Sequence, residues 1–236
     1  MVATVISVLA FLISLYGVWE KRRDQRKQEF LRLGLLVEEL NKLGYEQDRL
    51  GETLAAQGRQ VPSNLEAPNH SRRVVLCSEA NSLSGKLGKD VSSTQLRVIA
   101  DNWRRAGRND LSESLYRNII SNPDHGIDSM YAWRGLAHQL MLASREDEAR
   151  DCYRQAIKVA DEASPYPGWS VSEKCDIYLR WADLEASIGQ SANADNLIDI
   201  TKNLSSEIAY LPRRKQIMDR IDTTRRSRGD GSSITK

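Results

Sequence analysis

The amino-acid sequence predicts an all-α protein with an N-terminal single transmembrane helix, a heptad helix, three helical hairpins and a C-terminal capping helix. Three observations favour this class. No segment of strand length alternates apolar and polar residues, as a half-buried strand would. Helix-start signals recur along the second half of the chain. One residue pattern repeats there three times, at a period typical of stacked helical hairpins.

The first predicted element is a membrane anchor over residues 1–20. Val2 to Trp19 carries no charge, and at about 1.5 Å per residue it would form a helix of about 27 Å, close to the hydrocarbon thickness of a bilayer. Tyr16 and Trp19 suit the headgroup depth. A signal peptide would place basic residues before the apolar stretch and a cleavage site after it, and neither is found. We therefore expect an uncleaved anchor.

The location of charge and cysteine predicts the topology. Lys21, Arg22 and Arg23 follow the apolar stretch, so the positive-inside rule predicts a single-pass protein with its N-terminus out and its C-terminal domain in the cytoplasm. The three cysteines are an odd number without CxxC spacing, which favours free thiols in a reducing compartment. In the reverse topology, the sequons at Asn69 and Asn203 would face a glycosylating compartment.

Residues 21–57 form a basic flank followed by a heptad helix. Leucines recur there in alternating steps of three and four, as in a coiled coil, with Gln47 at a polar position of the stripe. The members of this leucine stripe are Leu33, Leu36, Leu40, Leu43, Leu50 and Leu54. The stripe either packs on another helix of the same chain or drives homo-oligomerisation. Glycines within it, each costing about 1 kcal/mol relative to alanine, weaken a dimer formed by this segment alone.

Residues 58–91 are interpreted as a linker followed by a helix. Turn and breaker residues, including Gly58, Pro62 and Pro68, mark Gln57 to Ser71 as the linker. Arg72 to Lys89 has helical apolar spacing, although Gly85 and Gly88 weaken its second half.

Four helix starts follow. Ser92 and Gln95 form a capping-box pattern, and Asn109 with Asp110 precedes the next periodic run. Ser144 with Asp147 opens a further run, and Ser170 with Glu173 repeats the box. Pro212 suits the first turn of a last helix, in which Ile217, Met218 and Ile221 would cover the end of the array.

The three copies of the pattern, Leu96 to Pro123, Trp133 to Asp161 and Tyr178 to Ser206, resemble the tetratricopeptide repeat in period and residue type. The resemblance covers about Ser92 to Ser206 and predicts a repeat domain over residues 92–227, followed by a disordered tail over 228–236. Small residues are expected where two helices cross closely, and large ones beside them. The expected repeat-core residues are Ala100, Trp103, Trp133, Leu136, Ala137, Ala149, Tyr153, Ala156, Trp181, Ala182 and Ala194.

The resemblance implies a concave groove, lined by the first helix of each hairpin, that binds peptides or helices of partner proteins. The groove residues carried over by the alignment are Arg97, Asp101, Arg104, Arg105, Tyr131, Arg134, His138, Met141, Asp176, Arg180 and Asp183. Arginines outnumber aspartates in this set, which favours a ligand with exposed carboxylates. The alternative is a solvated helix face with local ion pairs.

Two further features bear on this groove. Asp101, Gly135 and Asp176 stand where the carboxylate clamp of some family members requires asparagine or lysine, so binding of chaperone tails is disfavoured. Tyr166 and Trp169, in a loop inserted before the third copy, either form an aromatic hot spot for a partner or anchor the loop to its own core.

The composition argues against other classes. The net charge is only +2, so the sequence predicts no nucleic-acid ligand. Walker A and HExxH spacings do not occur, and the three histidines are scattered, so we expect no enzyme, cofactor or metal site. The sequence therefore predicts a membrane-anchored cytosolic adaptor that docks proteins or peptides. The rival hypothesis is a structural membrane protein that assembles through the leucine stripe.

Overall fold

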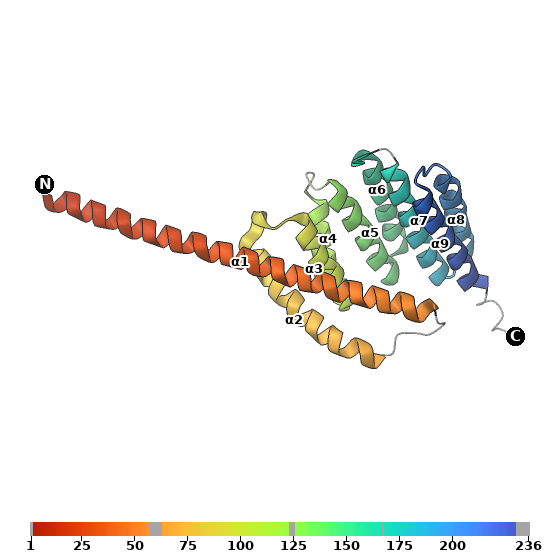
Figure 1. Ribbon diagram of the computed structural model, residues 1–236, viewed down its shortest axis with the longest axis horizontal. Coiled ribbons are helices and arrows are strands. Elements are labelled where there is room, and N and C mark those ends of the chain that lie inside the picture. The colour runs from red at the N-terminus through yellow and green to blue at the C-terminus, as the bar shows by residue number, and fades with distance from the viewer. Residues whose placement is uncertain (1, 57–62, 123–125, 167, 230–236) are drawn as a thin grey trace. The chain divides into compact units, whose positions relative to one another are not determined.

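The computed structural model describes the backbone of residues 2–56, 63–122, 126–166 and 168–229, and the side chains of residues 14–51, 53–54, 69–122, 126–166 and 168–225. Throughout these residues the chain is helical and forms no strand (Figure 1), so the all-α prediction is confirmed for them. The chain divides into two compact units, Met1–Arg108 and Asn109–Lys236. The division falls inside the first expected repeat. The first part of the predicted linker, residues 57–62, and the end of the predicted tail, residues 230–236, lie outside the described residues.

Unit 1 consists of helices α1 (Val2–Ala56), α2 (Ser63–Leu87) and α3 (Ser93–Arg105), with a 3-10 turn (Gly88–Asp90) before α3. Each of the three helices packs against the other two. Helix α2 begins inside the segment expected as linker. Helix α3 starts with the predicted capping box, because the Ser92 side chain accepts from the Gln95 amide while the Gln95 side chain accepts from the Ser92 amide.

The predicted transmembrane helix is wrong. Among the described residues, no helix combines the length and the apolar character needed to cross a membrane. Helix α1 continues without a break from the apolar stretch into the charged residues after Trp19. The single-pass, N-terminus-out localisation is corrected together with the anchor; side chains before Ser14 lie outside the described residues.

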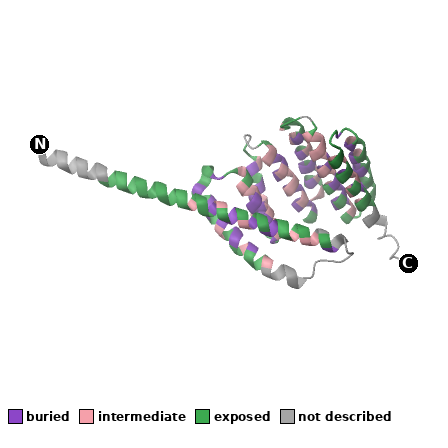
Figure 2. Cartoon of the chain, viewed as in Figure 1, coloured by how far each residue is buried: buried purple, intermediate pink, exposed green. Residues whose placement is uncertain are grey.

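Figure 2 shows buried residues along the part of α1 that packs against α2. Within the leucine stripe, Leu33 and Leu40 are fully buried, Leu36, Leu43 and Leu54 are nearly so, and Leu50 is half-buried. Helix α2, which packs against α1, buries its own residues with the same spacing. The intramolecular alternative for the stripe is therefore what the structure shows.

An internal pseudo-symmetry relates α1 and α2. At an offset of 40 positions the two helices carry identical residues, which are Arg32 and Arg72, Leu36 and Leu76, Glu39 and Glu79, Asn41 and Asn81, and Leu43 and Leu83. The ion pairs are reciprocal, since Arg32 binds Glu79 while Arg72 binds Glu39. Such reciprocity is the signature of a two-fold interface between identical helices. Helix α2 thus presents to α1 a surface that carries several of the residues of α1 at matching positions.

Unit 2 consists of α4 (Asn109–Ile120), α5 (Gly126–Leu142), α6 (Glu146–Glu162), α7 (Trp169–Ser187), α8 (Ser191–Ser205) and α9 (Leu211–Gly229). Each helix packs against the next, and α9 packs against α7 as well as α8. Helix α7 also packs against α5, two elements earlier. These described helices form a helical-repeat-like bundle, in which α5–α6 and α7–α8 are successive hairpins and α9 follows as a last helix.

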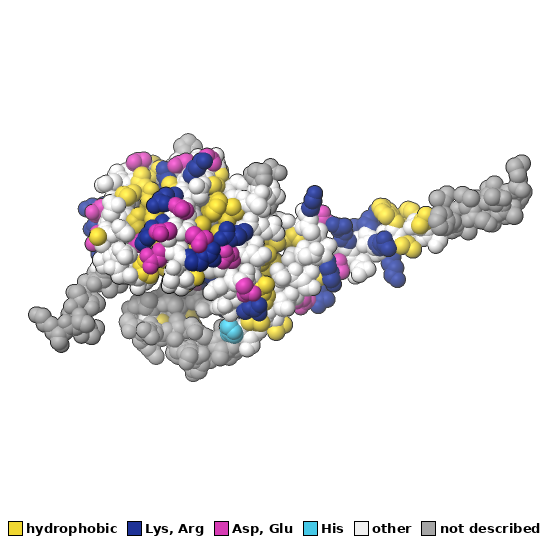
Figure 3. All heavy atoms as spheres, turned by 180° about the vertical axis from the view of Figure 1, so that it is seen from behind, with side chains coloured by type: hydrophobic (Ala, Val, Ile, Leu, Met, Phe, Trp, Pro, Cys, Tyr) yellow, Lys and Arg dark blue, Asp and Glu magenta, His cyan; other side chains and the backbone are white. Residues whose placement is uncertain are grey.

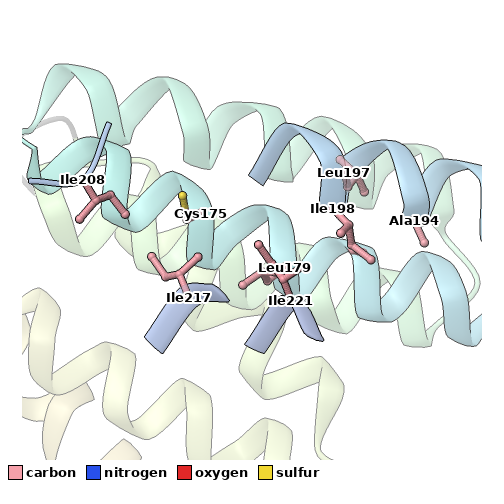
Figure 4. Close-up of a cluster of buried hydrophobic side chains, with 9 residues drawn as sticks. Cys175, Leu179, Ala194, Leu197, Ile198, Ile208, Ile217 and Ile221 are labelled. Carbon is pink, nitrogen blue, oxygen red and sulfur yellow. The ribbon is translucent and has the colours of Figure 1, made fainter. Parts of the chain in front are cut away.

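Helix α9 closes the bundle as predicted (Figure 4). Ile217 and Ile221 are buried on its inner face, against Cys175 and Leu179 of α7, and Met218 lies partly buried beside them. Helix α8 completes the same cluster with Ala194, Leu197 and Ile198. This cluster fixes α9 along α7, and the polar residues between the buried ones of these helices line the candidate site.

The turns after α3, α5 and α7 share one backbone motif. In each, a residue with positive φ follows the helix, namely Gly107 (φ 71°), Ser144 (φ 58°) and Gly189 (φ 83°). The amide of the following residue donates to a carbonyl five positions back, from Arg108 to Trp103, Arg145 to Leu140 and Gln190 to Glu185, as in a Schellman motif. Ser144, predicted to cap the helix that follows, instead ends the helix that precedes it, and α6 begins after Arg145 without a side-chain cap.

Candidate functional site

Four of the predicted groove residues lie in unit 1 and make local contacts there. Arg97 pairs with Asp101 one turn away at 3.5 Å. Arg105 reaches α1, where its two terminal nitrogens donate to the Asp48 carboxylate at 2.8 and 2.9 Å and one of them also donates to the Gly44 carbonyl. Arg104 is half-buried on the same helix. Arg105 thus joins α3 to α1, a structural role that the sequence alignment missed.

The remaining seven groove residues lie in unit 2, on α5 and α7. On α5, Tyr131, Arg134 and His138 are half-buried, whereas Met141 is only 1% exposed and packs in the core. The guanidinium of Arg134 lies over the Tyr131 ring, 4.9 Å from its centroid, and 3.9 Å from the Glu173 carboxylate of α7. Arg134 therefore joins α5 to α7 while remaining partly accessible.

Helix α9 brings two arginines to this face that the predicted groove did not include. Arg213 and Arg220 both donate to the Asp176 carboxylate of α7, and Arg213 also donates to the Ser172 hydroxyl at 2.8 Å. The Asp183 carboxylate accepts from the Thr224 hydroxyl at 3.1 Å. The basic run near the C-terminus could have indicated these two arginines from the sequence. Arg213 and Arg220 are two helical turns apart and therefore lie on one face of a helix.

Arg180 differs from its neighbours because it has no hydrogen bond or ion pair to any residue that the structure describes. Water reaches this exposed side chain. Yet desolvation by the surrounding protein lowers its pKa, and the positive charges of Arg134 and Arg220 lower the pKa further, against the opposing effect of Asp176. Arg180 is therefore accessible from solvent and lies close to other positive charges.

We call Arg134, Arg180, Arg213 and Arg220 the arginine cluster. The carboxylates among these four arginines are Asp176, which is shared by two of them, and Glu173. Burial raises the pKa of Glu173, although Arg134 and Arg213 lower it in part. Because four guanidinium groups face these two carboxylates, the face carries excess positive charge around Arg180. Figure 3 shows one face of unit 2, on which basic, acidic and hydrophobic side chains lie close together.

A cavity of about 680 Å³ adjoins the N-terminal end of α7. Tyr166 and Trp169 of the inserted loop line it together with Ile208, Ala209 and Tyr210 of the segment between α8 and α9. Its charged lining residues are Glu173, Glu207 and Arg213. The tyrosines are left open to water, Tyr166 at 61% and Tyr210 at 68% exposure. Tyr166 therefore does not anchor the loop in a core, which was one of the two alternatives for it.

The expected repeat-core residues are distributed between the two units. Ala100 and Trp103 are buried in unit 1, whereas Trp133 and Trp181 of unit 2 are half-buried. The others are fully buried in unit 2, and they are Leu136, Ala137, Ala149, Tyr153, Ala156, Ala182 and Ala194. The alanines allow close approach of paired helices. Trp181 stacks on Tyr153, with ring centroids 5.2 Å apart.

The cysteines offer no reactive centre. Cys77, Cys152 and Cys175 are free and buried, and burial raises the pKa of their thiols to about 12, 11 and 12. A thiol with so high a pKa stays protonated at neutral pH and is a poor nucleophile. Over the described residues, no group of histidine, cysteine, aspartate or glutamate side chains is arranged to hold a metal ion.

Comparison with known proteins identifies no relative. No family model, curated protein or solved structure matches this chain. The arrangement of the helices and the arginine cluster therefore carry the functional argument.

Proposed function

We propose that this chain is a helical-repeat scaffold of tetratricopeptide type, which binds acidic segments of partner proteins over the arginine cluster of unit 2. The observation that carries the proposal is Arg180, an exposed side chain that lies among like charges and has no ion pair with any described residue. Holding a like charge there opposes folding, and a bound carboxylate would relieve that repulsion. Sites at which a protein keeps such a locally unfavourable arrangement are commonly functional.

The chemistry of the cluster favours a carboxylate ligand. A guanidinium offers a planar fork of donors that binds a carboxylate through two parallel hydrogen bonds. Glu173 and Asp176 already orient the side chains of Arg134 and Arg220. Little conformational entropy is therefore lost when these two arginines contribute positive potential to a ligand bound at Arg180. The role is that of a binding surface that assembles proteins rather than one that transforms a substrate.

The proposal is tested with fluorescein-labelled Gly-Ser peptides that carry either a run of glutamates or the same run of glutamines. We expect the glutamate peptide to bind the full chain more tightly, with affinity falling as salt is added. Arg180→Glu should weaken binding at least about tenfold, which corresponds to about 1.4 kcal/mol. Fluorescence anisotropy gives both affinities.

The matched control is Arg154→Glu, which changes the same charge on the exposed surface of α6, away from the cluster. It should leave the affinity almost unchanged. If both variants lose affinity for the glutamate peptide equally, the effect is one of net charge and not of the cluster. If neither variant loses affinity, the cluster is only a solvated helix face. Affinity capture with the full chain and with Arg180→Glu would then identify the partners, as proteins retained only by the unaltered chain.

The rival hypothesis, assembly through the leucine stripe, has no comparable support among the described residues. The stripe is covered by α2 and α3, and Leu33, Leu36, Leu40 and Leu43 are buried against them. If the stripe nevertheless formed the interface, Leu40→Asp would change the oligomeric state measured by sedimentation while unit 1 stayed folded.

A further inference from the structure

The aromatic cavity and Arg180 lie along one face of α7. Trp169, Glu173, Asp176 and Arg180 follow one another at steps of three and four residues, the spacing that keeps side chains on one side of a helix. Trp169 and Glu173 line the cavity, and Arg180 lies two to three turns further along. At about 1.5 Å per residue, the two features are about 10 to 16 Å apart along the helix.

The cavity has the features of a pocket for one large side chain. Its volume falls within the range of about 300 to 1,000 Å³ found for ligand sites. Most of its lining is apolar, through Tyr166, Trp169, Ile208 and Tyr210. Leu211, next to Tyr210, is 67% exposed and extends the apolar surface. Exposed aromatic residues grouped beside polar ones are typical of interaction sites.

The charges near the cavity indicate which residues should flank the large side chain in the partner segment. The charged residues that line the cavity are Glu173, Glu207 and Arg213. Beyond the cavity, Arg213 connects through Asp176 to Arg220 and to the surroundings of Arg180. A partner segment that enters the cavity and continues along α7 would therefore meet excess positive charge within a few residues. Charge complementarity then requires carboxylates in that part of the segment.

We propose that the ligand is an extended acidic segment with one large apolar side chain, which occupies the aromatic cavity while a carboxylate about three to five residues away binds Arg180. The spacing follows from the separation along α7 and the rise of about 3.3 Å per residue in an extended chain. This inference rests on the proposed function, because it specifies the pattern of the acidic segment.

The test uses fluorescein-labelled Gly-Ser peptides in which one phenylalanine and a pair of glutamates are separated by about four residues, in either order. One comparison peptide has serine in place of phenylalanine, a second has glutamines in place of glutamates, and a third sets phenylalanine and glutamates much further apart. We expect the first peptide to bind the full chain at least about tenfold more tightly than any of the three.

Two variants assign the contacts. Tyr210→Ala should remove the advantage of phenylalanine and leave the serine peptide unaffected, whereas the matched control Tyr45→Ala, a tyrosine of unit 1 that is equally exposed, should change neither. Arg180→Glu should weaken both peptides. Because Tyr210 is exposed, its truncation leaves the core intact, which circular dichroism verifies.

The failures of the two proposals are distinguishable. If the serine peptide binds as tightly as the phenylalanine peptide and Arg180→Glu weakens both, the pocket inference is overturned and the docking of acidic segments stands. If phenylalanine improves binding at any separation, the spacing is wrong. If the glutamine peptide binds as well as the glutamate peptide and Arg180→Glu has no effect, the proposed function itself is overturned.

Discussion

Gly135 lies where α5 passes the buried ring of Tyr116 on α4. A Cβ atom at Gly135 would come within 2.6 to 2.7 Å of three atoms of that ring, Cζ, Cε1 and Oη. Tyr116 is fully buried, so its ring is surrounded by close-packed neighbours. The glycine is therefore required by packing between the two helices, although the alignment had placed it at a ligand-binding position of the groove.

We predict that Gly135→Ala lowers the free energy of unfolding by about 1 to 3 kcal/mol, because the added methyl group overpacks the contact with Tyr116. In an unobstructed helix the same substitution is stabilising by up to about 1 kcal/mol. Gly34→Ala provides that reference, since a Cβ there meets nothing within 4 Å. Urea unfolding followed by circular dichroism measures both, and stabilisation by Gly135→Ala would refute the contact.

Glu185 is a charged residue in the core of unit 2, only 1% exposed. Its carboxylate accepts two hydrogen bonds from the Arg150 guanidinium of α6, at 2.8 and 3.0 Å, and one from the Trp181 indole at 2.8 Å. Burial alone would raise the pKa of Glu185, but the bonds from Arg150 and Trp181 outweigh it and hold the pKa below its ordinary range. The ionised form is therefore the one that stabilises the fold.

The ion pair of Glu185 makes the free energy of unfolding depend on pH. Between the lowered pKa of the folded state and the ordinary glutamate pKa of about 4.3, the unfolded chain binds the proton and the folded chain does not, so stability rises with pH. We predict that Glu185→Gln lowers the free energy of unfolding by about 1 to 3 kcal/mol at neutral pH, and that this difference shrinks as the pH falls below about 4.3. Urea titrations at several pH values measure it, and a pH-independent difference would contradict the role of the charge.

At the scale of elements, the shared turn motif shows how three helices end alike. Two of its left-handed positions are glycines, which adopt positive φ without steric cost, and the third is Ser144. A side chain in this conformation costs about 1 to 2 kcal/mol. The sequence pattern at Ser144 indicated a helix start, because serine is also a common N-cap, and only the backbone shows which role it has.

We predict that Ser144→Gly raises the free energy of unfolding by about 1 kcal/mol, because it removes the strain of a β-carbon at positive φ. The reverse change at the equivalent turn, Gly189→Ser, should lower the free energy of unfolding by a similar amount. Thermal unfolding of the two variants checks the pair. A loss of stability in Ser144→Gly would mean that the serine side chain contributes more than its backbone costs.

The α1–α2 pair is the element for which the sequence left two alternatives open. A leucine stripe specifies that a helix needs an apolar partner, but not whether the partner is in the same chain. The reciprocal pairs Arg32–Glu79 and Arg72–Glu39 show that α2 supplies the matching surface. The ion pairs contribute little energy at the surface, but they fix which residues lie opposite each other.

At the scale of the whole molecule, the chain consists of two compact units that meet in sequence between Arg108 and Asn109. Each unit has its own buried residues, the leucine stripe with its partners in α2 and α3 in unit 1, and the α7–α8–α9 cluster in unit 2. A unit with its own core is expected to unfold as a cooperative whole.

We predict that core substitutions affect the units separately. Leu40→Asp buries an unpaired carboxylate and should abolish amide-exchange protection in α1, α2 and α3 while α5 to α9 keep theirs. Ile217→Asp should do the reverse, with the largest loss in α7, α8 and α9. Hydrogen exchange read by mass spectrometry resolves the two responses, and equal loss of protection in both units would show a single cooperative fold.

The sequence by itself determined the features that depend on local order along the chain. Apolar spacing and capping residues specify helices, and these signals correctly placed the helical class, the start of α3 and the inward face of α9. They also indicated a basic surface on the first helices of the hairpins. An apolar run next to basic residues, however, is no more than a local pattern, and the anchor predicted from it was wrong.

Only the tertiary structure decided which of these helices are partners and which charges remain available. It paired the leucine stripe with α2, joined Arg105 to Asp48, and brought Arg213 and Arg220 from the end of the chain to Asp176. Those contacts join residues far apart in sequence, and no local signal encodes them. Arg180 stands out for the same physical reason, because a charge is recognisable as uncompensated only when every neighbour brought to it by the fold is known.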